Sequence, residues 1–188
     1  VMQINDDGRI IDFEEKPESA KAMPDTPDMA LGSMGIYVFS LDYLNKQLVR
    51  DASDESSDHD FGKDVIPYAL AQGDHVQAYQ FQSPTQGGSP YWRDVGTIDA
   101  YHQANMELIS SDPPFDIYDR EWRIMSDQPQ LPPARFLCRG SGCGIENSMV
   151  SGGCEIESSK LYNSMLFSNV KVYQGCELNG VLALPGCE

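Results

Sequence analysis

The stretch Leu166-Phe-Ser-Asn-Val-Lys-Val-Tyr-Gln-Gly-Cys-Glu-Leu178 decides the fold of the second half of the chain. Leu166, Val172 and Leu178 stand six positions apart, and Leu184 continues the series. A period of six fits neither an amphipathic helix, which repeats about every 3.6 residues, nor a strand, which alternates. It is typical of hexapeptide β-helices, whose short strands turn three times in each coil.

The same period continues upstream with one interruption. Val150, Ile156 and Tyr162 are again six apart, so the register slips once between Tyr162 and Leu166. Small or apolar side chains four positions later reinforce the hexads: Cys154, Val170, Cys176 and Leu182. We therefore predict a β-helix over residues 137–188.

Residues 1–110 follow a different pattern, in which short apolar runs alternate with helical periodicity. The predicted strands are 9–16, which follows the turn Asn5-Asp-Asp-Gly8, 33–39 and 75–82; the predicted helices are 41–50, 60–73 and one capped by Thr97. The side chains expected to face the core are Leu41, Leu44 and Leu48 of the first helix and Val65, Ile66, Ala69 and Leu70 of the second. Such alternation predicts an α/β layer. Proline-rich residues 111–136 are expected to form a linker.

Composition and charge exclude several classes of partner. The 188 residues carry 29 Asp and Glu against 13 Lys and Arg, a formal net charge of −16, and 40% of them are hydrophobic. This balance indicates a folded protein that binds neither nucleic acid nor anionic membranes. A local cation and a divalent metal could still hold a small anionic substrate.

The five cysteines lie in the last third of the chain without CxxC spacing. We expect them to be reduced and the protein to be cytoplasmic. The first residue is Val1, and Pro185-Gly-Cys-Glu188 stops in the middle of a repeat. We therefore expect an internal fragment of a longer protein.

Three segments carry candidate chemistry. Glu15 and Lys16 come at the end of a strand, where an ammonium can meet a phosphate and a carboxylate can accept sugar hydroxyls. Ser33 carries a small hydroxyl group at the start of the predicted strand 33–39, where it could form a hydrogen bond with a sugar. Asp94, two residues before Gly96, could complete the oxygen shell of Mg²⁺. Each segment also has a purely structural alternative. Glu15 and Lys16 could be a solvated strand end, and Ser33 could have no functional role. Asp94 could cap a helix or pair with Arg93.

The order of six motifs resembles bacterial glucose-1-phosphate adenylyltransferase, also called ADP-glucose pyrophosphorylase. They are Phe13-Glu-Glu-Lys-Pro17, Ser33-Met-Gly-Ile-Tyr-Val-Phe39, His59-Asp-Phe-Gly-Lys-Asp-Val-Ile-Pro67, Tyr91-Trp-Arg-Asp-Val-Gly-Thr97, Leu131-Pro-Pro-Ala-Arg-Phe136 and Val150-Ser-Gly-Gly-Cys154. The resemblance implies an α/β fold: the C-terminal part of a Rossmann-like nucleotidyltransferase domain, followed by the start of a left-handed β-helix.

The resemblance also implies an activity and its residues. The family makes ADP-glucose and pyrophosphate from ATP and glucose 1-phosphate, with Mg²⁺, as an allosteric tetramer. It implies that Lys16 contacts the sugar phosphate, that Glu15 and Ser33 contact the glucose, that Trp92 shapes the pocket and that Asp94 binds the metal. Lys16 and Asp94 are thus the expected catalytic residues.

The resemblance also marks what the chain lacks. The glycine-rich ATP loop of the family would lie before Val1, so we expect this chain alone to be inactive. Three alternatives stay open: a pyrophosphorylase for UTP, dTTP or GTP, a hexapeptide acyltransferase, and a noncatalytic regulatory paralogue. None of the histidines at 59, 75 and 102 lies in the repeats, which disfavours the acyltransferase.

Overall fold

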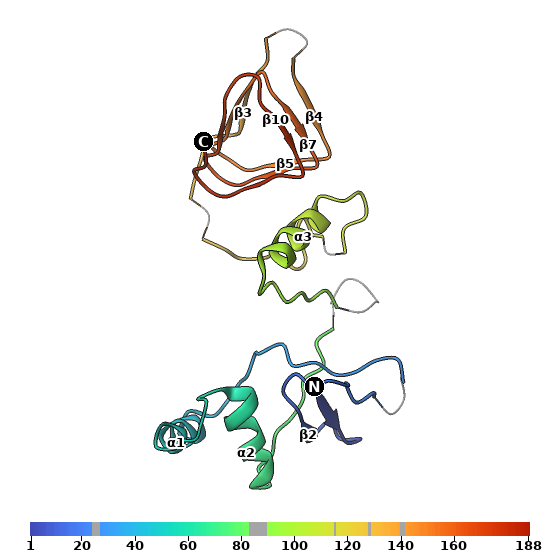
Figure 1. Cartoon of the computed structure of the whole chain (residues 1–188), viewed down its shortest axis with the longest axis vertical. Coiled ribbons are helices and arrows are strands. Elements are labelled where there is room, and N and C mark those ends of the chain that lie inside the picture. The colour runs from blue at the N-terminus through green and yellow to red at the C-terminus, as the bar shows by residue number, and fades with distance from the viewer. Residues whose placement is uncertain (24–26, 83–89, 115, 128, 140–141) are drawn as a thin grey trace. The chain divides into compact units, whose positions relative to one another are not determined.

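The computed structural model describes residues 1–188 except 24–26, 83–89, 115, 128 and 140–141, so parts of the predicted linker lie outside the described residues (Figure 1). The chain forms two compact units, Val1–Phe81 and Gln82–Glu188. No helix in the described part of the chain is long and apolar enough to cross a membrane.

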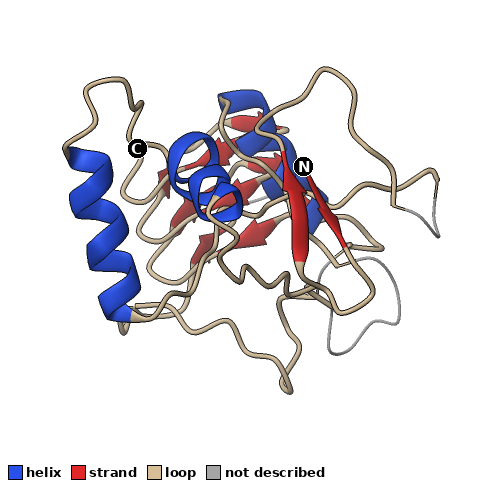
Figure 2. Ribbon diagram, turned by 90° about the horizontal axis from the view of Figure 1, so that it is seen from below, coloured by secondary structure: helices blue, strands red, loops and turns tan. Residues whose placement is uncertain are grey.

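A β-hairpin begins the first unit. β1 (Met2–Ile4) and β2 (Ile10–Phe13) pair antiparallel, with Met2 opposite Phe13, and appear as two adjacent arrows beside the N mark in Figure 2. Oδ1 of Asn5 accepts hydrogen bonds from the backbone N–H groups of Asp7 (3.1 Å) and Arg9 (2.9 Å), which closes the connecting turn. The predicted strand after this turn is therefore confirmed, over a shorter range.

The two helices predicted for the first unit are present. α1 spans Leu41–Ala52, and the π-helical turn η1 (Phe61–Val65) continues into α2 (Ile66–Ala71). Asp60 caps η1, since its Oδ1 accepts from the N–H groups of Gly62 (2.7 Å) and Lys63 (3.0 Å). Three predicted core residues are buried, namely Val65, Ile66 and Ala69.

The predicted inner face of α1 is wrong. Leu41 is 70% exposed, and the buried side chains of this helix are Gln47 and Asp51. The reason is that Asp51 forms hydrogen bonds with the loop before η1, so that polar contacts determine how the helix packs.

Residues 33–39 do not form the predicted strand. In the part of the chain that the structure describes, no strand pairs with them, and Val38 is 96% exposed. The two-residue alternation nevertheless persists, because Tyr37 and Phe39 pack with Phe61 on the other side. The strand predicted at 75–82 is reduced to an isolated bridge between Arg9 and Gln77.

The second unit contains α3 (Ile98–Leu108) and the repeats. Oγ1 of Thr97 accepts a hydrogen bond from Ala100 N at 3.1 Å, which confirms the predicted cap. Nε2 of His102 lies 2.8 Å from the backbone oxygen of Gly180, so this helix contacts the repeat region directly.

The repeats form a β-helix with three parallel sheets, seen nearly end-on as a triangle in Figure 1. Each sheet takes one strand from each of three coils. The strands are β3 (Arg135–Leu137), β6 (Glu155–Glu157) and β9 (Lys171–Val172) on one side, β4 (Gly144–Glu146), β7 (Lys160–Tyr162) and β10 (Glu177–Asn179) on the next, and β5 (Met149–Val150), β8 (Met165–Leu166) and β11 (Leu182–Ala183) on the third. The predicted β-helix is confirmed.

The inward positions correct the predicted register. Val150 pairs with Leu166, 16 residues later, whereas Leu161 pairs with Leu178, 17 residues later. Leu161 is fully buried, at 0% exposure, and Tyr162 is not. The proposed slip of four residues between Tyr162 and Leu166 is therefore wrong: two five-residue sides, Ile156 to Leu161 and Leu161 to Leu166, replace it.

The corners of the triangle use left-handed backbone conformations. Asn147, Asn163 and Gly180 stack in successive coils with φ of 43°, 45° and 66°. Nδ2 of Asn147 donates to Oδ1 of Asn163 at 2.7 Å. At another corner Gly153 (φ 77°) lies beside Asn169 (φ 61°). Asparagine and glycine tolerate this conformation better than other residues, which explains their recurrence.

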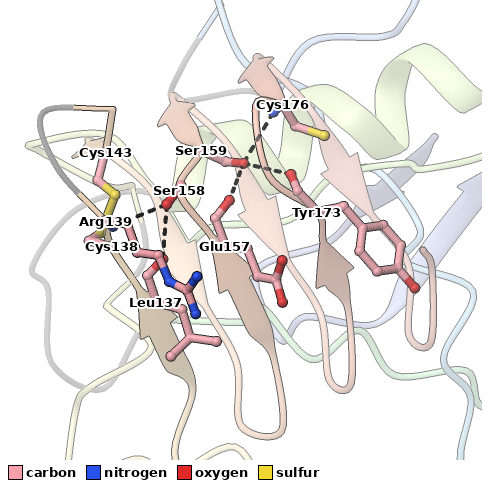
Figure 3. Close-up of a disulfide and its surroundings, with 9 residues drawn as sticks. All are labelled: Leu137, Cys138, Arg139, Cys143, Glu157, Ser158, Ser159, Tyr173 and Cys176. Atoms are coloured by element: carbon pink, nitrogen blue, oxygen red, sulfur yellow. Dashed lines mark hydrogen bonds between the residues drawn. A yellow bond between two sulfur atoms is a disulfide. The ribbon is translucent and has the colours of Figure 1, made fainter.

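The cysteine prediction is wrong for one pair, because Cys138 and Cys143 form a disulfide at the start of the β-helix (Figure 3). Their Cα atoms are 5.8 Å apart, a separation that a disulfide spans readily. The other cysteines are free; Cys154 is buried, and Cys176 and Cys187 are exposed.

Candidate functional site

Lys16 follows β2 in an unusual backbone conformation. Its φ is 44°, in the left-handed region that residues other than glycine seldom adopt. Its side chain is 91% exposed, and Nζ lies 3.9 Å from Oε1 of Glu15. Such strain persists only where the surroundings impose it, and it is frequent at ligand sites. The ammonium group is therefore accessible to an anion.

Glu15 lies against the start of η1. A Cβ atom placed on Gly62 would be 2.7 Å from Oε2 of Glu15, so a larger residue at position 62 would require this carboxylate to move. The carboxylate therefore lies directly beside the loop that Asp60 caps.

A cavity of about 600 Å³ in the first unit collects the predicted sugar-binding residues Glu15 and Ser33. Tyr37, Asp60 and Phe61 also line it. Oγ of Ser33 lies 3.0 Å from the hydroxyl of Tyr37, whose ring stacks on Phe61 at 5.7 Å. Carboxylates and hydroxyls around an aromatic wall suit a polyhydroxylated ligand.

Sequence reasoning missed Tyr37 and Phe61. For Tyr37 a signal existed, since the alternation from Ser33 places both hydroxyls on the same side. Asp60 has two places in the structure, since it caps η1 and also lines the cavity.

Asp94 lies in the second unit, and its carboxylate is exposed. Its Oδ1 accepts a hydrogen bond from Gly96 N at 3.1 Å. Among the ion pairs of the described residues, Arg93 pairs with Glu107 at 3.1 Å and none joins it to Asp94. Asp94 is therefore neither the Arg93 partner nor the cap of α3, which is Thr97.

The residues around Asp94 hold its neighbours in place. Glu107 accepts hydrogen bonds from the hydroxyl of Tyr91 (3.1 Å) and from Arg93, and the guanidinium of Arg93 lies 5.3 Å from the centre of the Tyr91 ring. The Arg93 guanidinium holds the pKa of Glu107 below its usual range. Trp92 lines a cavity of about 320 Å³ on this unit.

The structure allows a test of whether these residues suit a metal. In the described ranges, no three His, Cys, Asp or Glu side chains cluster as metal ligands. A lone carboxylate such as Asp94 still fits Mg²⁺, which takes one or two carboxylates and completes its octahedron with water and substrate phosphates.

The predicted residues divide between the two units. The structure brings Glu15 and Ser33 to one cavity with Lys16 adjacent in sequence, all within Val1–Phe81. Trp92 and Asp94 belong to Gln82–Glu188.

Comparison with known proteins defines the class. Residues 1–111 match the family model described as nucleotidyl transferase, and residues 132–188 match the GlmU-like C-terminal hexapeptide model. The chain belongs to the nucleotidyl transferase family. The predicted succession of a nucleotidyltransferase domain and hexapeptide repeats that form a left-handed β-helix is thereby confirmed.

Individual relatives show which members of this family the chain is similar to. Glucose-1-phosphate adenylyltransferase 1 of Alkalilimnicola ehrlichii is 53% identical over 154 residues, which are 81% of this chain and 36% of that protein. The glucose-1-phosphate adenylyltransferase of Methylobacillus flagellatus is 51% identical over 140 residues, 73% of this chain and 33% of that protein. The predicted resemblance is confirmed, and the chain spans about a third of the length of these relatives.

Proposed function

We propose that the chain is the sugar-phosphate-binding part of a glucose-1-phosphate adenylyltransferase, which makes ADP-glucose and pyrophosphate for glycogen synthesis. The observation that carries the proposal is the cavity where Glu15 and Ser33 meet, beside the exposed ammonium of Lys16. The names of the relatives supply the sugar and the nucleotide. Because the chain spans only about a third of these relatives, it is proposed to be inactive alone.

Each residue has a distinct role in this proposal. Lys16 pairs with the phosphate of glucose 1-phosphate, while Glu15 and Ser33 hold the sugar hydroxyls. Trp92 forms part of the pocket wall. Asp94 would hold Mg²⁺, which when bound offsets negative charge on the phosphates.

The reaction requires positioning more than a protein nucleophile. An oxygen of the sugar phosphate attacks the α-phosphorus of ATP in line, forming a new phosphorus–oxygen bond. The bond between that phosphorus and the bridging oxygen of the β-phosphate breaks, and pyrophosphate leaves with its electron pair. Lys16 orients the attacking phosphate and reduces its repulsion from the triphosphate.

The remaining proposals concern the whole protein. Residues 1–110 would belong to the catalytic domain, 111–136 to a linker and 137–188 to the β-helix. The full-length protein would be a cytoplasmic homotetramer under allosteric control, with ATP and glucose 1-phosphate as its small-molecule partners and no nucleic acid or membrane partner.

The test is pyrophosphate release by the full-length protein with glucose 1-phosphate and each of ATP, UTP, dTTP and GTP, with and without Mg²⁺. Release that requires ATP and Mg²⁺ is expected. Preference for another nucleotide would indicate a different pyrophosphorylase, and no release with any of them would indicate a noncatalytic paralogue. Asp94→Asn should abolish the Mg²⁺-dependent rate, whereas Asp99→Asn in the first turn of α3 should retain it.

A further inference from the structure

Asp51 is a buried carboxylate whose hydrogen bonds all go to one loop or to its own helix. It is 4% exposed. Nδ1 of His59 lies 2.9 Å from its Oδ2, and the hydroxyl of Ser57 donates to its Oδ1 at 2.8 Å. Arg50 adds a weaker contact at 3.3 Å. A buried aspartate with two loop partners connects α1 to the segment before η1.

The charge of Asp51 fixes the orientation of the His59 ring. The hydrogen bonds from His59 and Ser57 lower the pKa of Asp51, so it is ionised at neutral pH. An ionised carboxylate only accepts hydrogen bonds, and Nδ1 of His59 must therefore carry a proton. The other ring nitrogen, Nε2, does not take part in this contact.

The backbone of His59 also depends on this contact. Its φ is 58°, a left-handed value that is unfavourable for a non-glycine residue. Oγ of Ser57 accepts a hydrogen bond from His59 N at 3.0 Å, so the same hydroxyl that donates to Asp51 also holds the strained residue. Asp51 thus holds the side chain of His59 and Ser57 holds its main chain.

This residue begins one wall of the sugar cavity. His59, Asp60, Phe61 and Gly62 all line it. Gly62 lies against Glu15, so a shift of the loop would displace that carboxylate as well. Because φ and ψ are the flexible backbone angles of each residue, the conformation at His59 sets the direction in which the chain continues into Asp60 and thus the position of this wall of the cavity.

We propose that Asp51 and His59 are positioning residues for sugar-phosphate binding, which hold the Asp60–Gly62 wall of the cavity in place. The inference rests on the proposed function, and it adds two residues to the set taken from the motifs. Neither is required to touch the substrate.

The test uses steady-state kinetics of the full-length protein with two substrates varied in turn. His59→Gly keeps the left-handed backbone and loses the ring, and Asp51→Asn loses the charge. His59→Asn should act as the rescue variant, because asparagine tolerates a left-handed φ and retains an N–H donor for Asp51. The matched control is Asp58→Asn, which removes an exposed ion pair with Lys63 from the same loop.

We expect His59→Gly and Asp51→Asn to raise the KM for glucose 1-phosphate roughly five- to tenfold while the KM for ATP changes less than about twofold. His59→Asn should recover most of the loss, and Asp58→Asn should match the wild type. An unchanged KM for glucose 1-phosphate in both variants would overturn the proposal. So would an equal rise for ATP, or a failure to fold that His59→Asn does not rescue, since either result indicates general stability. A wild-type protein that makes no ADP-glucose would instead refute the proposed function.

Discussion

Arg93 pairs with Glu107, 14 residues later, and not with Asp94 beside it in the sequence. The pair joins the segment before α3 to the last turn of that helix. It keeps a cation away from the carboxylate that is proposed to hold Mg²⁺.

Removing Glu107 should therefore weaken the proposed metal site. In Glu107→Gln, Arg93 loses its anionic partner and becomes able to compete for Asp94, so the Mg²⁺ concentration for half-maximal activity should rise roughly two- to fivefold. A Mg²⁺ activation curve of the full-length protein measures the effect. Gln103→Ala is the control, because it removes a weaker contact with Glu107 (3.3 Å) and leaves the ion pair. Identical curves for Glu107→Gln and wild type would contradict the prediction.

Substitution of Lys16 should affect the two substrates unequally. Lys16→Gln removes the exposed ammonium, and the KM for glucose 1-phosphate should rise roughly tenfold to hundredfold, the range expected for a lost charge-assisted hydrogen bond. The KM for ATP should change less than about twofold. Lys16→Arg retains the charge and should be the milder variant. A larger effect on ATP would remove Lys16 from the sugar-phosphate site.

Asp51 should make stability depend on pH at the acid end. Its pKa is lowered in the folded state by His59 and Ser57, so its contribution is present above the unfolded value of about 3.9 and is lost as the pH falls through the folded value. The urea midpoint of the full-length protein should fall as the pH is lowered from about 6 to about 3, a window chosen around that pKa. It should fall less steeply for Asp51→Asn than for wild type. Asp58→Asn should alter the slope less, because solvent screens its ion pair with Lys63. Parallel slopes for Asp51→Asn and wild type would show that this carboxylate adds nothing.

Two glycines allow the cost of backbone strain to be compared with the cost of a steric clash. A Cβ on Gly153 (φ 77°) of the β-helix would lie 2.2 Å from Oδ1 of Asn169, whereas a Cβ on Gly73 (φ 76°), just after α2, meets nothing within 4 Å among the described residues. Gly73→Ala should cost about 1 kcal/mol and Gly153→Ala about 2–3 kcal/mol of unfolding free energy. Gly142→Ala, with no left-handed φ and no contact within 4 Å among the described residues, should be neutral. Urea denaturation of the full-length protein gives all three values, and equal losses at 153 and 73 would show that Asn169 simply moves aside.

Alkylation should distinguish the cysteines by their environment. Without reductant, iodoacetamide should label the buried Cys154 only on unfolding. Cys138 and Cys143 should appear in mass spectra as one cross-linked peptide and react only after reduction. Rapid labelling of that pair in untreated protein would restore the original expectation of free thiols.

The β-helix was predictable because its apolar period is unlike that of a helix or an ordinary strand. The choice between Leu161 and Tyr162 was not, because both are apolar and adjacent, and only the five-residue side places Leu161 inward. The same limit applies to α1. Helical spacing predicted the element, while the buried face was determined by hydrogen bonds from Asp51 to residues that follow the helix.

The candidate site was predictable where a short motif contains the chemistry. Glu15 and Ser33 do line one cavity, and the roles proposed for Lys16 and Asp94 stay predictions. Tyr37 was missed because a tyrosine within an apolar run is equally consistent with a residue of the hydrophobic core. The contact between Gly62 and Glu15 was not predictable, because it joins two segments that are distant in sequence.

The unequal coils of the β-helix make its pairing independent of a constant residue count. Successive strands stay aligned whether the intervening coil has 16 or 17 residues, because a side of the triangle can contain five or six. Two residues separate β6 from β7, whereas four separate β9 from β10, so the difference in length lies where the chain turns from one sheet to the next. Evolutionary change in length should accordingly accumulate at such turns, while the inward side chains of the strands keep their partners in the neighbouring coils.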